Sequence, residues 1–138
     1  MKETFRGVVY PAQCDAMGHM NVQYFIAALD QSLWHLMLAI GFSPRWIVER
    51  HEGWADVRYE IDFKGELRAG DLFVVEAGIV KLGRTSITTI HRICEAEGGS
   101  IAAEALAVSV YFDLSQRHSK ELPVKIREIA MSFLVADG

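Results

Sequence analysis

Cysteine is scarce in this chain, which has two, Cys14 and Cys94, among 138 residues. Two cysteines cannot build the framework of several disulfide bonds that holds small secreted domains together. The first residues, Met1 to Phe5, also lack the apolar stretch of a secretory signal. We therefore expect a reduced protein that resides in the cytoplasm.

Long apolar runs and surplus positive charge are missing as well. No run reaches the ~20 consecutive apolar residues that span a bilayer, because Asp30, Gln31 and Ser32 interrupt the longest candidate. The 14 Lys and Arg residues face 18 Asp and Glu residues, which gives a formal net charge of -4. Such a chain has no general attraction for polyanions. We expect neither a membrane nor a nucleic acid as a partner.

Hydrophobic residues, by contrast, make up 51% of the sequence. A chain of this length and composition can close a hydrophobic core without disulfide bonds or metal ions. No internal repeat or low-complexity stretch divides it. We expect residues 1–138 to form a single domain.

The first half of the chain predicts one strand and one long helix. Residues Thr4 to Tyr10 are rich in β-branched and aromatic side chains and end at Pro11, which cannot donate to a sheet. A helix is expected from about Val22 to Ile40, with Asn21 as its cap and Gly41 as its stop. Apolar residues cover nearly its whole circumference, so we expect this helix to be buried.

The second half predicts an antiparallel sheet. Charged residues alternate with Ala55, Val57, Tyr59, Ile61 and Phe63, a pattern typical of a half-buried strand. Turn signals separate the strand-like runs that follow, which we expect to pair as consecutive hairpins, and an amphipathic helix closes the chain. The order of elements predicts an α+β fold with one antiparallel sheet around one helix. These later segments are Leu72 to Leu82, Ser86 to Ala96, Ser100 to Phe112 and the helix Val124 to Leu134.

Polar side chains crowd the entrance to the long helix, over Asp15 to Asn21. The start of a helix presents unpaired N–H groups and a partial positive charge, which can hold an oxyanion developing on a polarised carbonyl. Gly18 would let that carbonyl approach closely. Asp15 can attack a thioester carbon directly or deprotonate a water molecule that does so. The alternative is that Asp15 is only a turn or cap residue.

The neighbouring side chains each have a functional and a structural interpretation. His19 can orient Asp15 or touch a substrate, or it can shape the loop through a hydrogen bond to the backbone. Asn21 is expected to cap the helix, and Tyr24 to pack one turn inside it with its hydroxyl in reach of a pocket. A nucleophilic role for Cys14 is not favoured, because no base is evidently linked to it. The other histidines lack ligand spacing, so we expect no metal.

Three tryptophans, Trp34, Trp46 and Trp54, lie on the long helix and on the segment that follows it. Core packing is the commoner explanation, although these side chains could also shape an acyl pocket. If two of them faced a cavity, they could hold a quaternary ammonium by cation–π attraction. That arrangement would point to a betaine-like or carnitine-derived acyl group.

The residues Asp15 to Tyr24 resemble the signature of the 4-hydroxybenzoyl-CoA thioesterase group of hotdog proteins, which usually reads Asp-x-x-Gly-His-x-Asn-x-x-Tyr. Every fixed position of that signature is filled in this sequence. The resemblance spans about Val9 to Phe112, with further matches at Tyr59 to Phe63, Arg68 to Asp71 and Gly83 to Ser86.

The resemblance implies a hotdog fold, in which a five-stranded antiparallel sheet wraps around the central helix. It implies acyl-CoA hydrolysis without a cofactor, with Asp15 as the catalytic carboxylate and the start of the Val22 helix polarising the thioester carbonyl. It also implies homodimers or homotetramers with active sites at the subunit interface. The residues expected to bind the substrate are Gly18, His19, Met20, Asn21 and Tyr24.

The details of the acyl and CoA sites are less defined. The sequence departs from the group at Val22, where a second Asn is usual, and at Gln23, where the group has a small residue. The phosphates of CoA require cations or backbone N–H groups. Basic residues that could serve, or could simply belong to a solvated sheet face, are Lys64, Arg68, Lys81, Arg84 and Arg92.

Two other functions stay open. A non-catalytic hotdog module would bind an acyl-CoA or serve as an oligomeric partner, and it would not need Asp15. A thioesterase of the same design could act on acyl carrier protein, because both carriers present a phosphopantetheine arm. A hotdog dehydratase is disfavoured, since His19 does not fit that family's Asp-x-x-x-x-His run.

Overall fold

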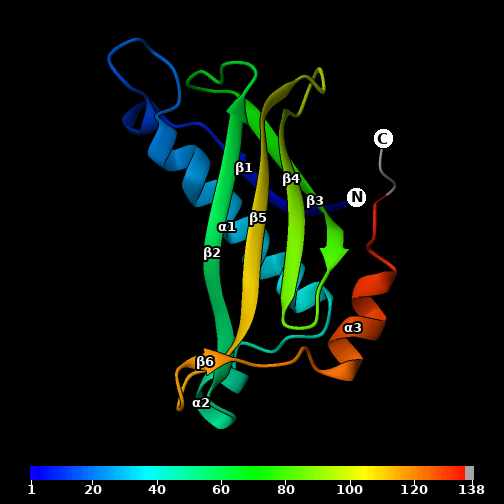
Figure 1. Cartoon of the computed structure of the whole chain (residues 1–138). Coiled ribbons are helices and arrows are strands. Elements are labelled where there is room, and N and C mark those ends of the chain that lie inside the picture. The colour runs from blue at the N-terminus through cyan, green and yellow to red at the C-terminus, as the bar shows by residue number, and fades with distance from the viewer. Residues whose placement is uncertain (136–138) are drawn as a thin grey trace.

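A curved antiparallel sheet with one long helix across one of its faces dominates the computed structural model, which describes residues 1–135 (Figure 1). The helical segments are η1 (Pro11–Gln13), α1 (Val22–Ala39), α2 (Trp46–Glu49) and α3 (Val124–Met131). The strands are β1 (Lys2–Val8), β2 (Glu52–Phe63), β3 (Leu72–Leu82), β4 (Ser86–Glu95), β5 (Ile101–Asp113) and β6 (His118–Ser119).

Helix α1 begins and ends where the sequence predicts. The Asn21 side chain caps it, because its Oδ1 accepts a hydrogen bond from the Gln23 N–H at 3.0 Å. Ile40 is the C-terminal cap, and Gly41 follows with a φ of 103°. This left-handed conformation suits glycine and stops the helix.

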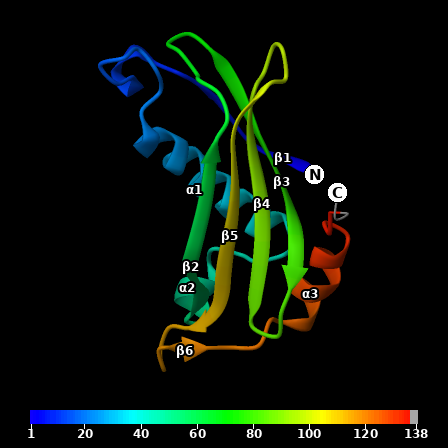
Figure 2. The same ribbon diagram turned by 45° about the horizontal axis from the view of Figure 1, so that its top comes forward.

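The sheet has the strand order β1-β3-β4-β5-β2, and every pairing is antiparallel. The predicted consecutive hairpins are confirmed for β3, β4 and β5. Strand β2 does not pair with β3, the next strand along the chain; it pairs with β5, while β1 pairs with β3. Helix α1 joins β1 to β2 across the sheet and so places these two strands at opposite edges (Figure 2). The two-residue β6 adds a sixth strand beside β5 to the five expected.

A β-bulge in β2 corrects the predicted alternation of this strand. The register with β5 shifts between Asp56 and Arg58, so that Val57 is the extra residue and stands 60% exposed. Asp56 lies opposite the buried Ser109 and shares the helix-facing side of the sheet with Tyr59. Ala55 and Val57 therefore do not share the face of Tyr59, as the simple alternation had predicted.

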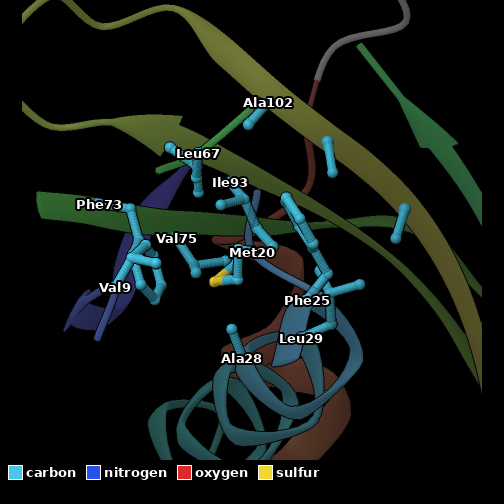
Figure 3. Close-up of a cluster of buried hydrophobic side chains, with 12 residues drawn as sticks. Val9, Met20, Phe25, Ala28, Leu29, Leu67, Phe73, Val75, Ile93 and Ala102 are labelled. Carbon is cyan, nitrogen blue, oxygen red and sulfur yellow. The ribbon is translucent and has the colours of Figure 1, made fainter. Parts of the chain in front are cut away.

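The core fills the space between α1 and the sheet in two adjoining clusters. Phe25, Ala28 and Leu29 of α1 pack on Val75 and Ile93 in the first cluster, together with Met20 from the preceding loop (Figure 3). The second cluster continues along the helix. Its buried members are Leu33, Met37, Ile40, Phe42, Ile79, Ile87, Tyr111, Leu122, Ile126 and Ala130.

The far side of α1 remains open to solvent, which corrects the expectation of a helix buried all round. Val22, Ile26, Trp34 and Leu38 are between 44% and 54% exposed. The reason is geometric, since a single sheet covers only one side of the helix that lies on it. The apolar stripe of these four residues is left without a covering element within residues 1–135.

The ends of the chain differ modestly from expectation. The first strand runs from Lys2 to Val8 rather than from Thr4 to Tyr10, and α3 ends at Met131 rather than at Leu134. Leu134 instead forms a parallel bridge with Ile79. The predicted domain of residues 1–138 includes three residues, 136–138, that lie outside the described part. No helix within residues 1–135 is long and apolar enough to cross a membrane.

Candidate active site

The loop that precedes α1 folds back on itself as a small hairpin. Cys14 and Met20 form an antiparallel bridge, and the Asp15 N–H donates to the His19 carbonyl at 2.8 Å. The Asn21 N–H donates to the Gln13 carbonyl, also at 2.8 Å. These bonds bring both ends of the loop together and hold Asp15 next to the residues that start α1.

The carboxylate of Asp15 is tied into this loop by one of its two oxygens. Oδ1 accepts hydrogen bonds from the N–H groups of Met17, at 2.8 Å, and His19, at 3.2 Å. Among residues 1–135, no donor bonds to the second oxygen. Asp15 is thus the turn residue that the structural interpretation expects, and it also keeps one carboxylate oxygen available for chemistry.

Gly18 occupies the tip of the loop with a φ of 85°. This left-handed conformation is one that side chains with a Cβ rarely adopt. A Cβ at this position would meet no atom within 4 Å. The backbone conformation, and not a lack of space, therefore favours glycine here. The Gly18 N–H donates to the Asp15 carbonyl at 3.0 Å and closes the turn.

The first turn of α1 offers an unused donor beside this loop. The Gln23 N–H bonds to the cap, and the Tyr24 N–H donates to the Asn21 carbonyl at 2.9 Å. The Val22 N–H has no acceptor within residues 1–135. Because the 18-residue helix carries a partial positive charge at this end, the site can attract a developing negative charge.

The His19 imidazole contacts Glu66 and makes no hydrogen bond to the Asp15 carboxylate within residues 1–135, although one interpretation had assigned it the role of orienting Asp15. Its Nε2 lies 3.0 Å from Glu66 Oε2, and its backbone forms a bridge with Arg68. His19 therefore positions Asp15 through its backbone N–H, while its ring holds the segment between β2 and β3. No local signal could reveal Glu66, because it reaches His19 from a distant part of the sequence.

Met20 and Tyr24 differ in how far they are open to a ligand. Met20 is 4% exposed, its side chain points into the core (Figure 3), and its N–H donates to the Leu67 carbonyl at 2.7 Å. Tyr24 is half-buried and lines a groove of about 390 Å³ between β1 and α1, together with Tyr10 and Gln13. The structure thus gathers the polar residues of the motif around the loop and turns Met20 inward.

Cys14 has no base beside its thiol within the described chain. The Cys14 Sγ lies 3.8 Å from the Tyr10 carbonyl oxygen, and no histidine bonds to it within the described chain. Within that same part, no group of three or more His, Cys, Asp or Glu side chains is placed to hold a metal ion.

A second cavity, of about 330 Å³, lies between α1 and β2. The sequence offered Trp34 and Trp54 as possible walls of an acyl pocket but gave no sign of Asp30 or Asp56. Asp30 and Trp34 line it from α1, and Trp54 and Asp56 line it from β2. Burial, followed by the nearby Asp56, raises the pKa of Asp30. Two of the three tryptophans therefore face one cavity. The third, Trp46, packs edge-on against Phe42 with 5.6 Å between ring centroids.

A buried polar chain links α1 to the sheet beneath it. The Ser32 hydroxyl lies 2.7 Å from His91 Nδ1, and the Thr89 hydroxyl lies 2.9 Å from His91 Nε2. Thr4 bonds to Ser32 from β1. Burial lowers the pKa of His91 from 6.5 to about 4, so its ring is neutral at physiological pH. We infer that these buried hydrogen bonds hold helix α1 on the sheet.

A protein-family model, described as the thioesterase-like superfamily, matches residues 9–130 of this chain. Among the curated proteins, none matches the chain significantly.

Solved structures share its fold. A 1,4-dihydroxy-2-naphthoyl-CoA thioesterase from Synechocystis is 20% identical with a TM-score of 0.81, over 92% of this chain and 93% of that one. A hypothetical protein from Staphylococcus aureus in complex with CoA is 13% identical with a TM-score of 0.90, over 99% and 89%. A thioesterase from Thermus thermophilus, complexed with coenzyme A and Zn, is 27% identical with a TM-score of 0.80, over 95% and 92%.

Proposed function

Since this chain belongs to the thioesterase-like superfamily and has a hotdog fold, we propose that it hydrolyses acyl-CoA thioesters to a carboxylic acid and CoA. Within the superfamily, the motif from Asp15 to Tyr24 favours the 4-hydroxybenzoyl-CoA thioesterase group. Residues 1–138 would act as one domain in the cytoplasm.

The observation that carries this proposal is the pairing of Asp15 with the start of α1. The loop hydrogen bonds hold the carboxylate beside the first turn of the helix and leave one oxygen unbonded within residues 1–135. The same loop leads into α1, where the Val22 N–H has no acceptor within residues 1–135. A carboxylate next to an oxyanion-stabilising donor is what thioester hydrolysis requires.

The thioester carbonyl oxygen would accept from the start of α1, which draws electrons from the carbonyl carbon. In one route, the unbonded Asp15 oxygen bonds to that carbon, the C–S bond breaks, and water then cleaves the acyl anhydride. In the other, Asp15 takes a proton from water, whose oxygen attacks the carbon, and the proton passes to the departing CoA sulfur. Both routes use the same carboxylate.

The other motif residues would support binding. Gly18 leaves open space at the tip of the loop, and Asn21 sets the geometry of the helix start. Tyr24 lines the groove next to the loop, whereas Met20 would contribute through its backbone, because its side chain is in the core. The contact between His19 and Glu66 would hold the loop against the segment between β2 and β3.

Arg68 is the basic residue best placed for the phosphates of CoA. Its backbone bridges to His19, so it lies beside the catalytic loop, and its side chain is 70% exposed. Arg68 contacts Glu66 at 3.5 Å, whereas Arg92 bonds more closely to Glu104, at 2.7 Å. The Staphylococcus aureus and Thermus thermophilus structures are described as CoA complexes, which supports CoA as the carrier.

The test is release of free thiol by the purified protein from short, long, aromatic and cationic acyl-CoAs and from acyl carrier protein thioesters. The proposal expects turnover of at least one CoA thioester. Turnover confined to acyl carrier protein would change the carrier but keep the chemistry. Tight CoA binding without turnover of any thioester would replace the proposal with the non-catalytic binding module.

A further inference from the structure

The cavity between α1 and β2 has walls suited to a positively charged group. Asp30 and Trp34 come from α1, and Trp54 and Asp56 come from β2. Leu33, Met37 and Ile47 supply apolar surface between them. Among the described residues that line the cavity, none is a Lys, Arg or His.

Its two carboxylates carry the electrostatic argument. Asp56 is fixed by the Ser109 hydroxyl, which donates to its Oδ1 at 2.8 Å. Burial, followed by the charge of Asp56, raises the pKa of Asp30, because negative charge on this carboxylate is unfavourable in the cavity. Burial, then Asp56 and Asp30, raise the pKa of Tyr59, which stays a neutral hydroxyl. A bound cation would offset the negative charge of the carboxylates.

The two indoles carry the argument for an organic cation. Trp54 is held edge-on by Tyr111, with 5.0 Å between ring centroids, and by Phe42, at 5.8 Å. Trp34 is 47% exposed at the mouth of the cavity. Indole faces attract ammonium groups, and methyl groups on nitrogen would fit the apolar walls better than a hydrated metal ion would.

We infer that this cavity receives the end of an acyl chain that carries an alkylammonium group. The inference rests on the proposed thioesterase function and adds a substrate class to it. Asp30 lies ~12 Å along α1 from Val22, so the length of the spacer between carbonyl and nitrogen is part of the test.

The experiment compares matched pairs of acyl-CoAs at several spacer lengths. One member of each pair ends in a trimethylammonium group, and the other ends in the neutral, isosteric tert-butyl group. Thiol release gives kcat/KM for both. We expect at least one spacer length at which the cationic member is preferred by ~10-fold or more.

The variants Asp30→Asn and Asp56→Asn should each lower that preference, and asparagine at position 56 keeps an oxygen that can accept from the Ser109 hydroxyl. Asp62→Asn is the matched control, because Asp62 is an exposed carboxylate of β2 outside the cavity, and it should leave the preference unchanged. Circular dichroism verifies folding. Equal rates on both members at every spacer length, or a preference that survives both cavity variants, would overturn the inference.

Failure of the proposed function is distinguishable from failure of this inference. If no thioester is hydrolysed, calorimetry with trimethylammonioacetate and with 3,3-dimethylbutanoate, which has an uncharged tert-butyl group in place of the trimethylammonium group, decides the question. Binding of trimethylammonioacetate that is weakened by Asp56→Asn supports the cavity's role. Equal binding of both acids, or no binding of either, refutes it.

Discussion

His91 shows how a single buried side chain can govern stability. It is fully buried under α1, and both ring nitrogens lie against hydroxyl groups of Ser32 and Thr89. A charged ring there would lose its hydration, so burial lowers the pKa of His91 from 6.5 to about 4. Between these two pH values, the unfolded chain binds a proton that the folded chain does not.

We therefore predict that stability falls as the pH drops from 6.5 towards 4, by up to ~3 kcal/mol from this residue. Above pH 6.5 the ring is neutral in both states and the contribution is complete. Urea unfolding at pH 7.5, 5.5 and 4.5 measures the effect. His91→Gln, which can still bond to both hydroxyls, should flatten the profile. An equally steep loss in the variant would contradict the assignment.

At the residue scale, the sequence predicted what lies close together along the chain. The loop residue Asp15, the cap Asn21 and the inward-packing Tyr24 belong to one short motif, so their placement at the start of the helix could be predicted. Glu66, which contacts His19, and Asp56, which lines a cavity with Asp30, come from other parts of the chain. Their contacts depend on how the sheet closes, which no local pattern encodes.

At the scale of elements, α1 was predictable because its cap, stop and apolar content are local signals. The strands β3, β4 and β5 were predictable for the same reason. The pairing of β1 with β3 and of β2 with β5 was not, because it depends on the path of α1 across the sheet. The bulge at Val57 also escaped prediction, because apolar and charged residues keep alternating through β2 and the sequence pattern shows no break where the register shifts.

Substitutions at Asn21 separate the stability of α1 from its electrostatic role. Asn21→Ala removes the acceptor for the Gln23 N–H and should cost ~1 kcal/mol of unfolding free energy. Asn21→Asp keeps that acceptor but adds a negative charge where the thioester oxygen would become an anion. We predict that the Asp variant is folded as stably as wild type and hydrolyses thioesters ~10-fold or more slowly.

Chemical denaturation and thiol release measure the two quantities on the same preparations. An Asp variant with wild-type kcat/KM would show that the start of α1 takes no part in catalysis.

At the scale of the whole molecule, the stripe of apolar residues on α1 is left uncovered within residues 1–135. Val22, Ile26, Trp34 and Leu38 are exposed on one side of the helix, and β2 is an edge strand. Exposed apolar patches and open strand edges are features that a second subunit can cover. We propose a homodimer, or a homotetramer built from it.

We predict a sedimenting mass of two or four times the 15.5 kDa of one chain. Ile26→Asp places a charge in the stripe and should shift the protein towards the monomer. Val124→Asp is the control, because Val124 is exposed on α3 outside the stripe. Wild-type protein that sediments as a monomer at micromolar concentration would contradict the prediction.

The central claim is that Asp15 performs the chemistry and does more than shape its loop. Asparagine at this position retains the oxygen that accepts the Met17 and His19 N–H groups, whereas alanine removes it. The direct measurement is the kcat/KM of wild type, Asp15→Asn and Asp15→Ala on the best acyl-CoA, with folding matched by circular dichroism. A catalytic carboxylate predicts a loss of ~100-fold or more in both variants. An Asn variant that keeps wild-type activity while the Ala variant loses it would reduce Asp15 to a turn residue.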